Sequence, residues 1–107
     1  MLARVVELNV IPEKIEKLRT LISNEVLPTL KKVPGLVDTI GLVNSKTPTT
    51  ILNILLFNTK NDLEKYERET LPPIMQKLRP YLSQNPKIEI CNVETSTFHR
   101  ISAGIAA

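Results

Sequence analysis

The stretch T-I-L-N-I-L-L-F-N, Thr50–Asn58, decides how the rest of the chain can fold. Read as a strand, it carries apolar side chains on both faces: Ile51, Leu55 and Phe57 on one, and Leu52, Ile54 and Leu56 on the other. Such a strand needs cover from both directions, so we predict that it lies inside a sheet. Asn53 interrupts the first face, and a buried amide needs hydrogen-bond partners from protein, water or a ligand. Asn53 is therefore the first candidate for function.

The composition indicates a single domain over residues 1–107, with one hydrophobic core. The hydrophobic share is 42%, and three Gly against eight Pro, without a Gly- or Ser-rich run, leave no candidate linker.

The sequence argues against an intrachain disulfide, a signal peptide, a membrane segment and a nucleic-acid partner. The lone Cys91 cannot form an intrachain disulfide, and Arg4 and Glu7 interrupt the N-terminal apolar run, which argues against a signal peptide. No stretch approaches the roughly 20 apolar residues that span a bilayer, so we expect a cytoplasmic protein without a membrane segment. The net charge of +3 comes from 14 basic residues interleaved with 11 acidic ones, and 4% aromatic residues offer little for base stacking. We expect no nucleic-acid partner.

The first half of the chain predicts a strand, a helix and a second strand. Residues Ala3–Val10 alternate as a strand, and Pro12 suits the first position of a helix with an apolar stripe from Ile15 to Leu30. We expect Pro28 to kink this helix near Asn24–Leu27 and Pro34-Gly35 to end it in a left-handed turn.

The second half predicts a hairpin, a broken helix and a last strand. The strand Leu36–Asn44 should pair antiparallel with Thr50–Asn58 through the polar connection Ser45–Thr49. Helical periodicity then runs from Asn61 to Arg79. Pro72-Pro73 should break or sharply bend it, which gives one helix to about Thr70 and a shorter one to about Arg79, and Lys87–Phe98 alternates again as a strand.

This order of elements predicts an α+β, ferredoxin-like βαββαβ fold: a four-stranded antiparallel sheet with two helices on one face. A weak repeat agrees with it, since E-V-L-P at Glu25–Pro28 recurs as E-T-L-P at Glu69–Pro72, 44 residues later.

The face of the sheet away from the helices should be apolar. If Val6, Leu8, Leu52, Ile54 and Leu56 face the helices, then Val5, Ile51, Leu55 and Phe57 lie on the open face. We therefore predict a C2 homodimer that packs sheet against sheet, a dimeric α+β barrel. Glu7, Asn9, Asn53 and Asn92 would share this inner face. They either line a small-molecule pocket or hydrogen-bond to one another across the dimer, and both alternatives stay open.

Three motifs resemble those of a known family: E-V-L-P-T-L near the end of the first helix, V-P-G-L at Val33–Leu36, and the strand Thr50–Asn58 leading into T-K-N-D-L-E-K-Y. From about Leu2 to about Val93 the chain resembles the antibiotic biosynthesis monooxygenase domain of the dimeric α+β barrel superfamily. In the cofactor-independent oxygenases of that family, a strand Asn and a Trp four residues later are associated with an aromatic substrate. The resemblance assigns Asn53 to the Asn and puts Phe57 where the Trp stands, which keeps a stacking surface but removes the indole N–H.

The remaining candidates have plainer interpretations. Haem-degrading relatives need a His on the second helix, and Asn61–Arg79 has none, so we expect no haem and no other cofactor. One Cys and one His cannot make a metal site. We interpret His99 as a surface or dimer-contact residue, Cys91 as a buried thiol, and Tyr66 as a core or pocket-edge residue.

Together these observations predict a cofactor-independent monooxygenase acting on an aromatic or quinol-like molecule, with Asn53 as catalytic residue and Phe57, Glu7, Asn9 and Tyr66 as ligand-binding residues. The alternative is a non-catalytic, ligand-binding or stress-response barrel in which the polar residues only set the dimer register.

Overall fold

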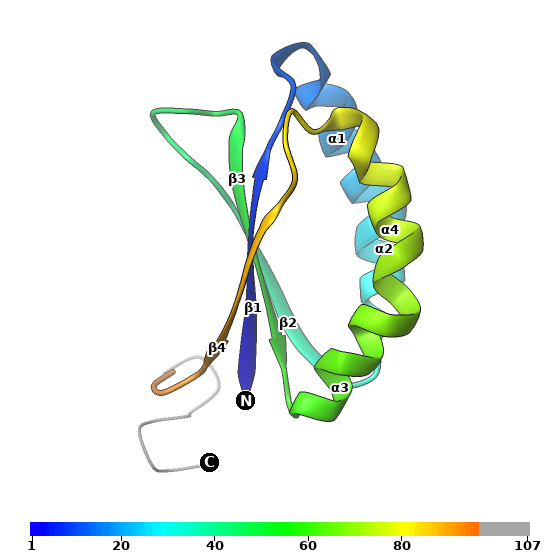
Figure 1. Ribbon diagram of the computed structural model, residues 1–107, viewed down its shortest axis with the longest axis vertical. Coiled ribbons are helices and arrows are strands. Elements are labelled where there is room, and N and C mark those ends of the chain that lie inside the picture. The colour runs from blue at the N-terminus through cyan, green and yellow to red at the C-terminus, as the bar shows by residue number, and fades with distance from the viewer. Residues whose placement is uncertain (97–107) are drawn as a thin grey trace.

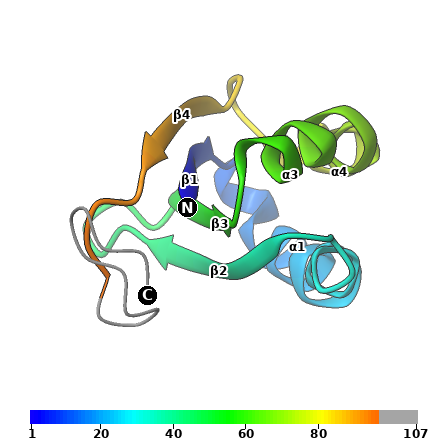
Figure 2. The ribbon, with the colours of Figure 1, turned by 90° about the horizontal axis from the view of Figure 1, so that it is seen from below.

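A computed structural model describes residues 1–96 and has the predicted order of elements. The strands are β1 (Leu2–Asn9), β2 (Leu36–Val43), β3 (Thr50–Phe57) and β4 (Lys87–Asn92). The helices are α1 (Ile15–Leu21), α2 (Leu27–Leu30), α3 (Lys60–Lys65) and α4 (Leu71–Leu78), with short 3-10 turns at Pro12–Lys14 and Arg79–Tyr81. All helices lie on one side of the sheet (Figures 1 and 2).

The sheet has the strand order β2-β3-β1-β4, and all its neighbours are antiparallel. The ferredoxin-like prediction is confirmed, and β3 lies between β2 and β1 as its two apolar faces required. β4 ends at Asn92, so the described chain leaves the sheet earlier than the predicted Lys87–Phe98. Phe98 itself lies outside the described residues.

The turn before β2 depends on Gly35. Its φ of 79° is in the left-handed region, and a Cβ built there would overlap the Asp62 carboxyl group. The Gly35 carbonyl also accepts a hydrogen bond from the Asn58 N–H at 2.9 Å, which ties this turn to the end of β3. The predicted left-handed turn is confirmed.

The two Leu-Pro motifs each follow a π-helical turn. These turns span Ile22–Val26 and Tyr66–Thr70, and in each the next leucine donates its N–H to the carbonyl five residues back. A helical proline clashes with the carbonyl four residues earlier, and a wider turn makes room for it. The kink predicted near Asn24–Leu27 therefore takes the form of a π turn. The division predicted at Pro72-Pro73 is present: the first segment ends with the π turn at Thr70, and α4 runs from Leu71 to Leu78. The chain stays helical through the junction, so it takes the form of a π turn and not of a complete break.

The π turns also strengthen the weak repeat. They begin at Ile22 and Tyr66, which are 44 residues apart, the same spacing as the two Glu-x-Leu-Pro motifs. The two βαβ halves thus deform their helices at equivalent places.

The sheet register corrects the predicted faces of β3. Val6 lies opposite Asn53 and Leu8 opposite Ile51, and directly opposed residues of antiparallel strands point to the same face. Ile51, Leu55 and Phe57 therefore pack with Val6 and Leu8 against the helices, and each is buried. The prediction that they lie on the open face is wrong. With both faces of β3 apolar, the alternation alone could not distinguish them.

The opposite face of the sheet carries no helix in residues 1–96 (Figure 2). Its apolar residues include Val5, Leu52, Ile54 and Leu56, together with Ile40 and Leu42 of β2, which are 41% and 44% exposed. We call this surface the open face. No helix in the described part of the chain is long and apolar enough to cross a bilayer.

Candidate functional site

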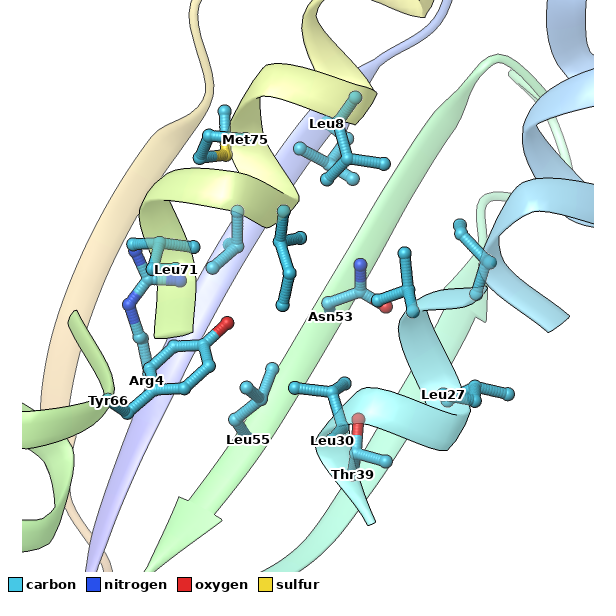
Figure 3. A pocket seen from close by; sticks show the side chains of 15 residues that line it. Arg4, Leu8, Leu27, Leu30, Thr39, Asn53, Leu55, Tyr66, Leu71 and Met75 are labelled. Atoms are coloured by element: carbon cyan, nitrogen blue, oxygen red, sulfur yellow. The ribbon is translucent and has the colours of Figure 1, made fainter. Parts of the chain in front are cut away.

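A cavity of about 60 Å³ lies between the sheet and the two helical segments (Figure 3). Most of its wall is aliphatic, from both layers. The lining residues are Arg4, Val6, Leu8, Ile22, Val26, Leu27, Leu30, Thr39, Asn53, Leu55, Tyr66, Leu71, Ile74, Met75 and Leu78.

The repeat places equivalent residues on the two sides of this cavity. Ile22 and Tyr66 begin the two π turns, and Leu27 and Leu71 belong to the two Leu-Pro motifs. π turns inside α-helices occur frequently at functional sites. The feature that accommodates the prolines thus also shapes the wall of the cavity.

Asn53 lies on the sheet side of the cavity, as its place in an apolar stretch suggested. Its neighbour on β2 is Gly41, where a Cβ would stand 3.5 Å from the Asn53 Oδ1 atom, so the β2 residue directly opposite adds no side chain beside the amide. Within residues 1–96 this amide has no hydrogen-bond partner in the protein. It remains able to bind a ligand oxygen by its N–H groups or a ligand hydroxyl by its carbonyl.

Tyr66 lies on the other side of the cavity, and its hydroxyl points across towards Asn53 (Figure 3). The ring is buried and packs 5.3 Å from the Phe57 ring. Burial raises the pKa of the Tyr66 phenol; the nearby Arg4 charge opposes this shift, and Glu67 adds to it. Tyr66 therefore stays protonated at neutral pH and can donate a hydrogen bond into the cavity.

Arg4 is a cavity residue that the sequence reasoning missed. It is only 3% exposed, its Nε donates to Glu67 Oε2 at 3.1 Å, and its Cζ lies 5.7 Å from the centre of the Tyr66 ring. The signal was present in the alternation of β1, where Arg4 has the same parity as Val6 and Leu8. A charged side chain on the core-facing side of a strand needs an ion-pair or hydrogen-bond partner, or it has a functional role.

Phe57 does not line the cavity. It is fully buried beneath Tyr66, at 0% exposure, so a ligand would meet the Tyr66 ring and not Phe57. The stacking surface expected from Phe57 is part of the core.

Glu7 and Asn9 are on the open face, away from Asn53, so the prediction that these polar residues share one face is wrong. They bind each other and their neighbours: Asn9 Nδ2 donates to Glu7 Oε2 at 3.2 Å, and Thr50 Oγ1 donates to Asn9 Oδ1 at 3.0 Å. Asn92 lies opposite Leu2 on β1, so it is on the face of the sheet that the helices cover.

Cys91 does not line the cavity. Cys91 is exposed in the single chain, opposite Ala3 on the open face, so the expected burial is wrong. His99 lies outside the described residues. Residues 1–96 contain no group of three or more His, Cys, Asp and Glu side chains that could hold a metal ion.

Comparison with known proteins establishes the fold. No protein-family model and no curated protein matches the chain. Among solved structures, a conserved protein from Methanosarcina mazei Go1 has a TM-score of 0.75 at 22% identity, over 88% of this chain and 94% of that one. A proposed antibiotic biosynthesis monooxygenase from Nitrosomonas europaea gives 0.75 at 15% identity, over 87% and 98%.

A third structure is a monooxygenase from the gene ActVA-Orf6 of Streptomyces coelicolor, in complex with the ligand nanaomycin D. It gives a TM-score of 0.67 at 20% identity and covers 89% of this chain and 88% of that one. The chain therefore has the fold of structures named as antibiotic biosynthesis monooxygenases, as its motifs suggested.

Proposed function

We propose that this protein is a cytoplasmic, cofactor-independent monooxygenase that binds an aromatic or quinol-like molecule in the cavity between sheet and helices. The observation that carries the proposal is the Asn53 amide, which stands without a protein partner in an aliphatic cavity. A concave apolar site with a few convergent polar groups is the usual form of a small-molecule site. Nanaomycin D, the ligand of a structural neighbour, is consistent with an organic ligand in this fold.

The chemistry requires the site to favour the ionised form of a phenolic substrate. A hydrogen-bond donor at the substrate oxygen stabilises the phenolate, and the electron-rich ring then reacts with dioxygen at its opposite end. There an Asn53 N–H stabilises the negative oxygen that forms. In a phenol with a free para C–H, one oxygen atom enters the ring and the other leaves as water, giving a para-quinone. The ring supplies all the electrons, so no external reductant takes part.

Binding requires the cavity to widen. Its volume is about 60 Å³, whereas an apolar cavity that holds benzene is about 150 Å³. Leu27, Leu71 and Met75 line the cavity and are only partly buried, and Met side chains adapt easily to new contacts. We expect these three side chains to move when an aromatic ring enters.

Oxygen uptake with a panel of naphthols that have a free para C–H tests the proposed reaction. Asn53→Ala should lower the rate by about 10²-fold, the scale seen when an oxyanion donor is removed. Asn61→Ala is the matched control, since Asn61 is exposed on α3 and does not line the cavity. Equal rates in the parent protein and Asn53→Ala would remove Asn53 from the mechanism.

We further propose that the open face forms a C2 homodimer. Its exposed apolar side chains include Ile40 and Leu42, and burying such a face is the main driving force of association. Ile54→Lys, at the centre of this face, should give a monomer by analytical ultracentrifugation and faster maleimide labelling of Cys91. A parent protein that sediments as a monomer at micromolar concentration contradicts the dimer.

The burial of Phe57 favours a second candidate, a ligand-binding barrel without turnover. Neither an indole N–H nor a ring lines the cavity at that position. In that case aromatic ligands raise the melting temperature of the protein without oxygen uptake.

A further inference from the structure

The side of the cavity formed by Arg4 and Tyr66 holds polar groups that the proposed reaction does not use. The Arg4 side chain is 4% exposed and Tyr66 is 4% exposed. Within residues 1–96, Arg4 makes one side-chain hydrogen bond, from Nε, and the Tyr66 hydroxyl makes none. Both Nη groups of Arg4 and the Tyr66 O–H therefore lack protein acceptors. Buried donors without acceptors are rare in native proteins, and each calls for an explanation.

A purely structural role does not explain this arrangement well. A buried ion pair is often no more stabilising than apolar residues of similar volume, and most of the other residues that line the cavity are aliphatic. A methionine at position 4 could fill the same space without burying a charge.

The electrostatics of this side favour a negative ligand. Arg4 is buried, whereas the side chain of its partner Glu67 is 36% exposed, so solvent screens the carboxylate more than the guanidinium. Arg4 and Tyr66 are the charged or titratable residues among those that line the cavity, and Glu67 reaches the cavity only through Arg4. A negative group in the cavity is therefore attracted by Arg4 more strongly than it is repelled by Glu67.

We propose that the cavity selects acidic phenols and binds them as phenolate anions, with the Tyr66 hydroxyl donating to the phenolate oxygen and the Arg4 charge stabilising it. Asn53 faces Tyr66 across the cavity (Figure 3) and is left for the opposite end of the ring. The ligand class is thus an acidic phenol that is ionised at the Arg4–Tyr66 end of the cavity. This inference rests on the proposed binding in this cavity but does not require oxidation.

A nitrophenol whose phenolate absorbs visible light gives a direct test. Titrating the nitrophenol with and without excess protein should show the bound phenol ionising about one pH unit lower than the free one, which is tenfold tighter binding of the anion. Tyr66→Phe should weaken anion binding about tenfold, because a hydrogen bond to a charged group is lost. Arg4→Met combined with Glu67→Gln should abolish the shift.

Arg19→Gln is the matched control, because it also removes one positive charge but from an exposed side chain of α1 outside the cavity lining. It should leave the shift unchanged. If the Arg4 variant fails to fold, Tyr66→Phe decides by itself, since only a hydroxyl is removed.

The outcomes separate this inference from the proposed reaction. Phenolate binding without oxygen uptake supports the inference and contradicts the oxidation alone. Oxygen uptake with no lowering of the ionisation pH of the bound phenol overturns the inference and leaves the reaction. Failure to bind either form of the phenol contradicts both.

Discussion

Each face of the sheet carries an asparagine, Asn9 on one and Asn53 on the other, and the two amides differ in their hydrogen bonds. On the open face, Asn9 binds Glu7 and Thr50, so its amide is satisfied within the sheet. On the helix face, the Asn53 amide has no partner in the described chain and lies in an aliphatic cavity. The same residue type therefore orders the sheet on one side and is available to a ligand on the other. A polar residue in a strand therefore indicates a ligand site only when the structure shows that it lacks hydrogen-bond partners in the protein.

The largest difference between the faces should be in stability. Leu55 and Leu56 are adjacent in β3, but Leu55 is buried in the core and Leu56 is on the open face. Leu55→Ala should lower the free energy of unfolding by about 2–5 kcal/mol. Leu56→Ala should cost about 1 kcal/mol or less in the monomer, with a loss that grows as a dimer forms. Urea denaturation at several protein concentrations measures both, and equal losses would contradict the assignment of faces.

The ion pairs of the two faces give the next largest contrast. Glu67 pairs with the buried Arg4, whereas Glu7 pairs with Lys87, whose side chain is 71% exposed. Glu67→Gln leaves a buried guanidinium without its carboxylate and should cost about 1–3 kcal/mol, reduced by the partial exposure of Glu67. Glu7→Gln should cost about 0–1 kcal/mol. Thermal denaturation of the two variants compares them, and a larger effect at Glu7 would show that Arg4 does not need its partner.

A small change beside Asn53 should alter binding more than stability. A Cβ at Gly41 meets Asn53 Oδ1 at an ordinary contact distance of 3.5 Å, and Gly41 has no positive φ. Gly41→Ala should shift the free energy of unfolding by less than about 1 kcal/mol. It should weaken the binding of aromatic ligands, because the added methyl group restricts the Asn53 amide. Gly35→Ala, at a positive φ, should instead destabilise the protein without a specific effect on binding. Parallel melting and ligand titration distinguish the two glycines.

The smallest effect concerns pH. Because burial raises the folded-state pKa of Tyr66, its contribution to stability is fully present below the pKa of the unfolded chain, about 10. It is lost as pH rises through the higher folded-state value. The free energy of unfolding should therefore decline above about pH 10, and Tyr66→Phe should lessen that decline relative to the parent protein. Identical pH profiles for the parent protein and Tyr66→Phe would mean that Tyr66 is better solvated than its burial indicates.

Much of the fold could be predicted because its signals are local. Apolar residues on both faces of Thr50–Asn58 required an interior strand, and the structure places β3 there. Pro34-Gly35 required a turn, and Gly35 adopts it. The two Leu-Pro motifs marked where the helices depart from regular α geometry, although a π turn takes the place of the second expected break. Helical period, proline and glycine act over a few residues, so they can be read without knowing the rest of the molecule.

What only the tertiary structure decided is which side of each strand meets the helices. With both faces of β3 apolar, the choice depends on the register with β1 and β2, which joins residues far apart in the chain. That register moved Ile51, Leu55 and Phe57 into the core, separated Asn53 from Glu7 and Asn9, and brought Arg4 beside Tyr66. By itself the sequence determined that Asn53 interrupts an apolar face; the pairing of strands determined that this face encloses a cavity with a buried cation.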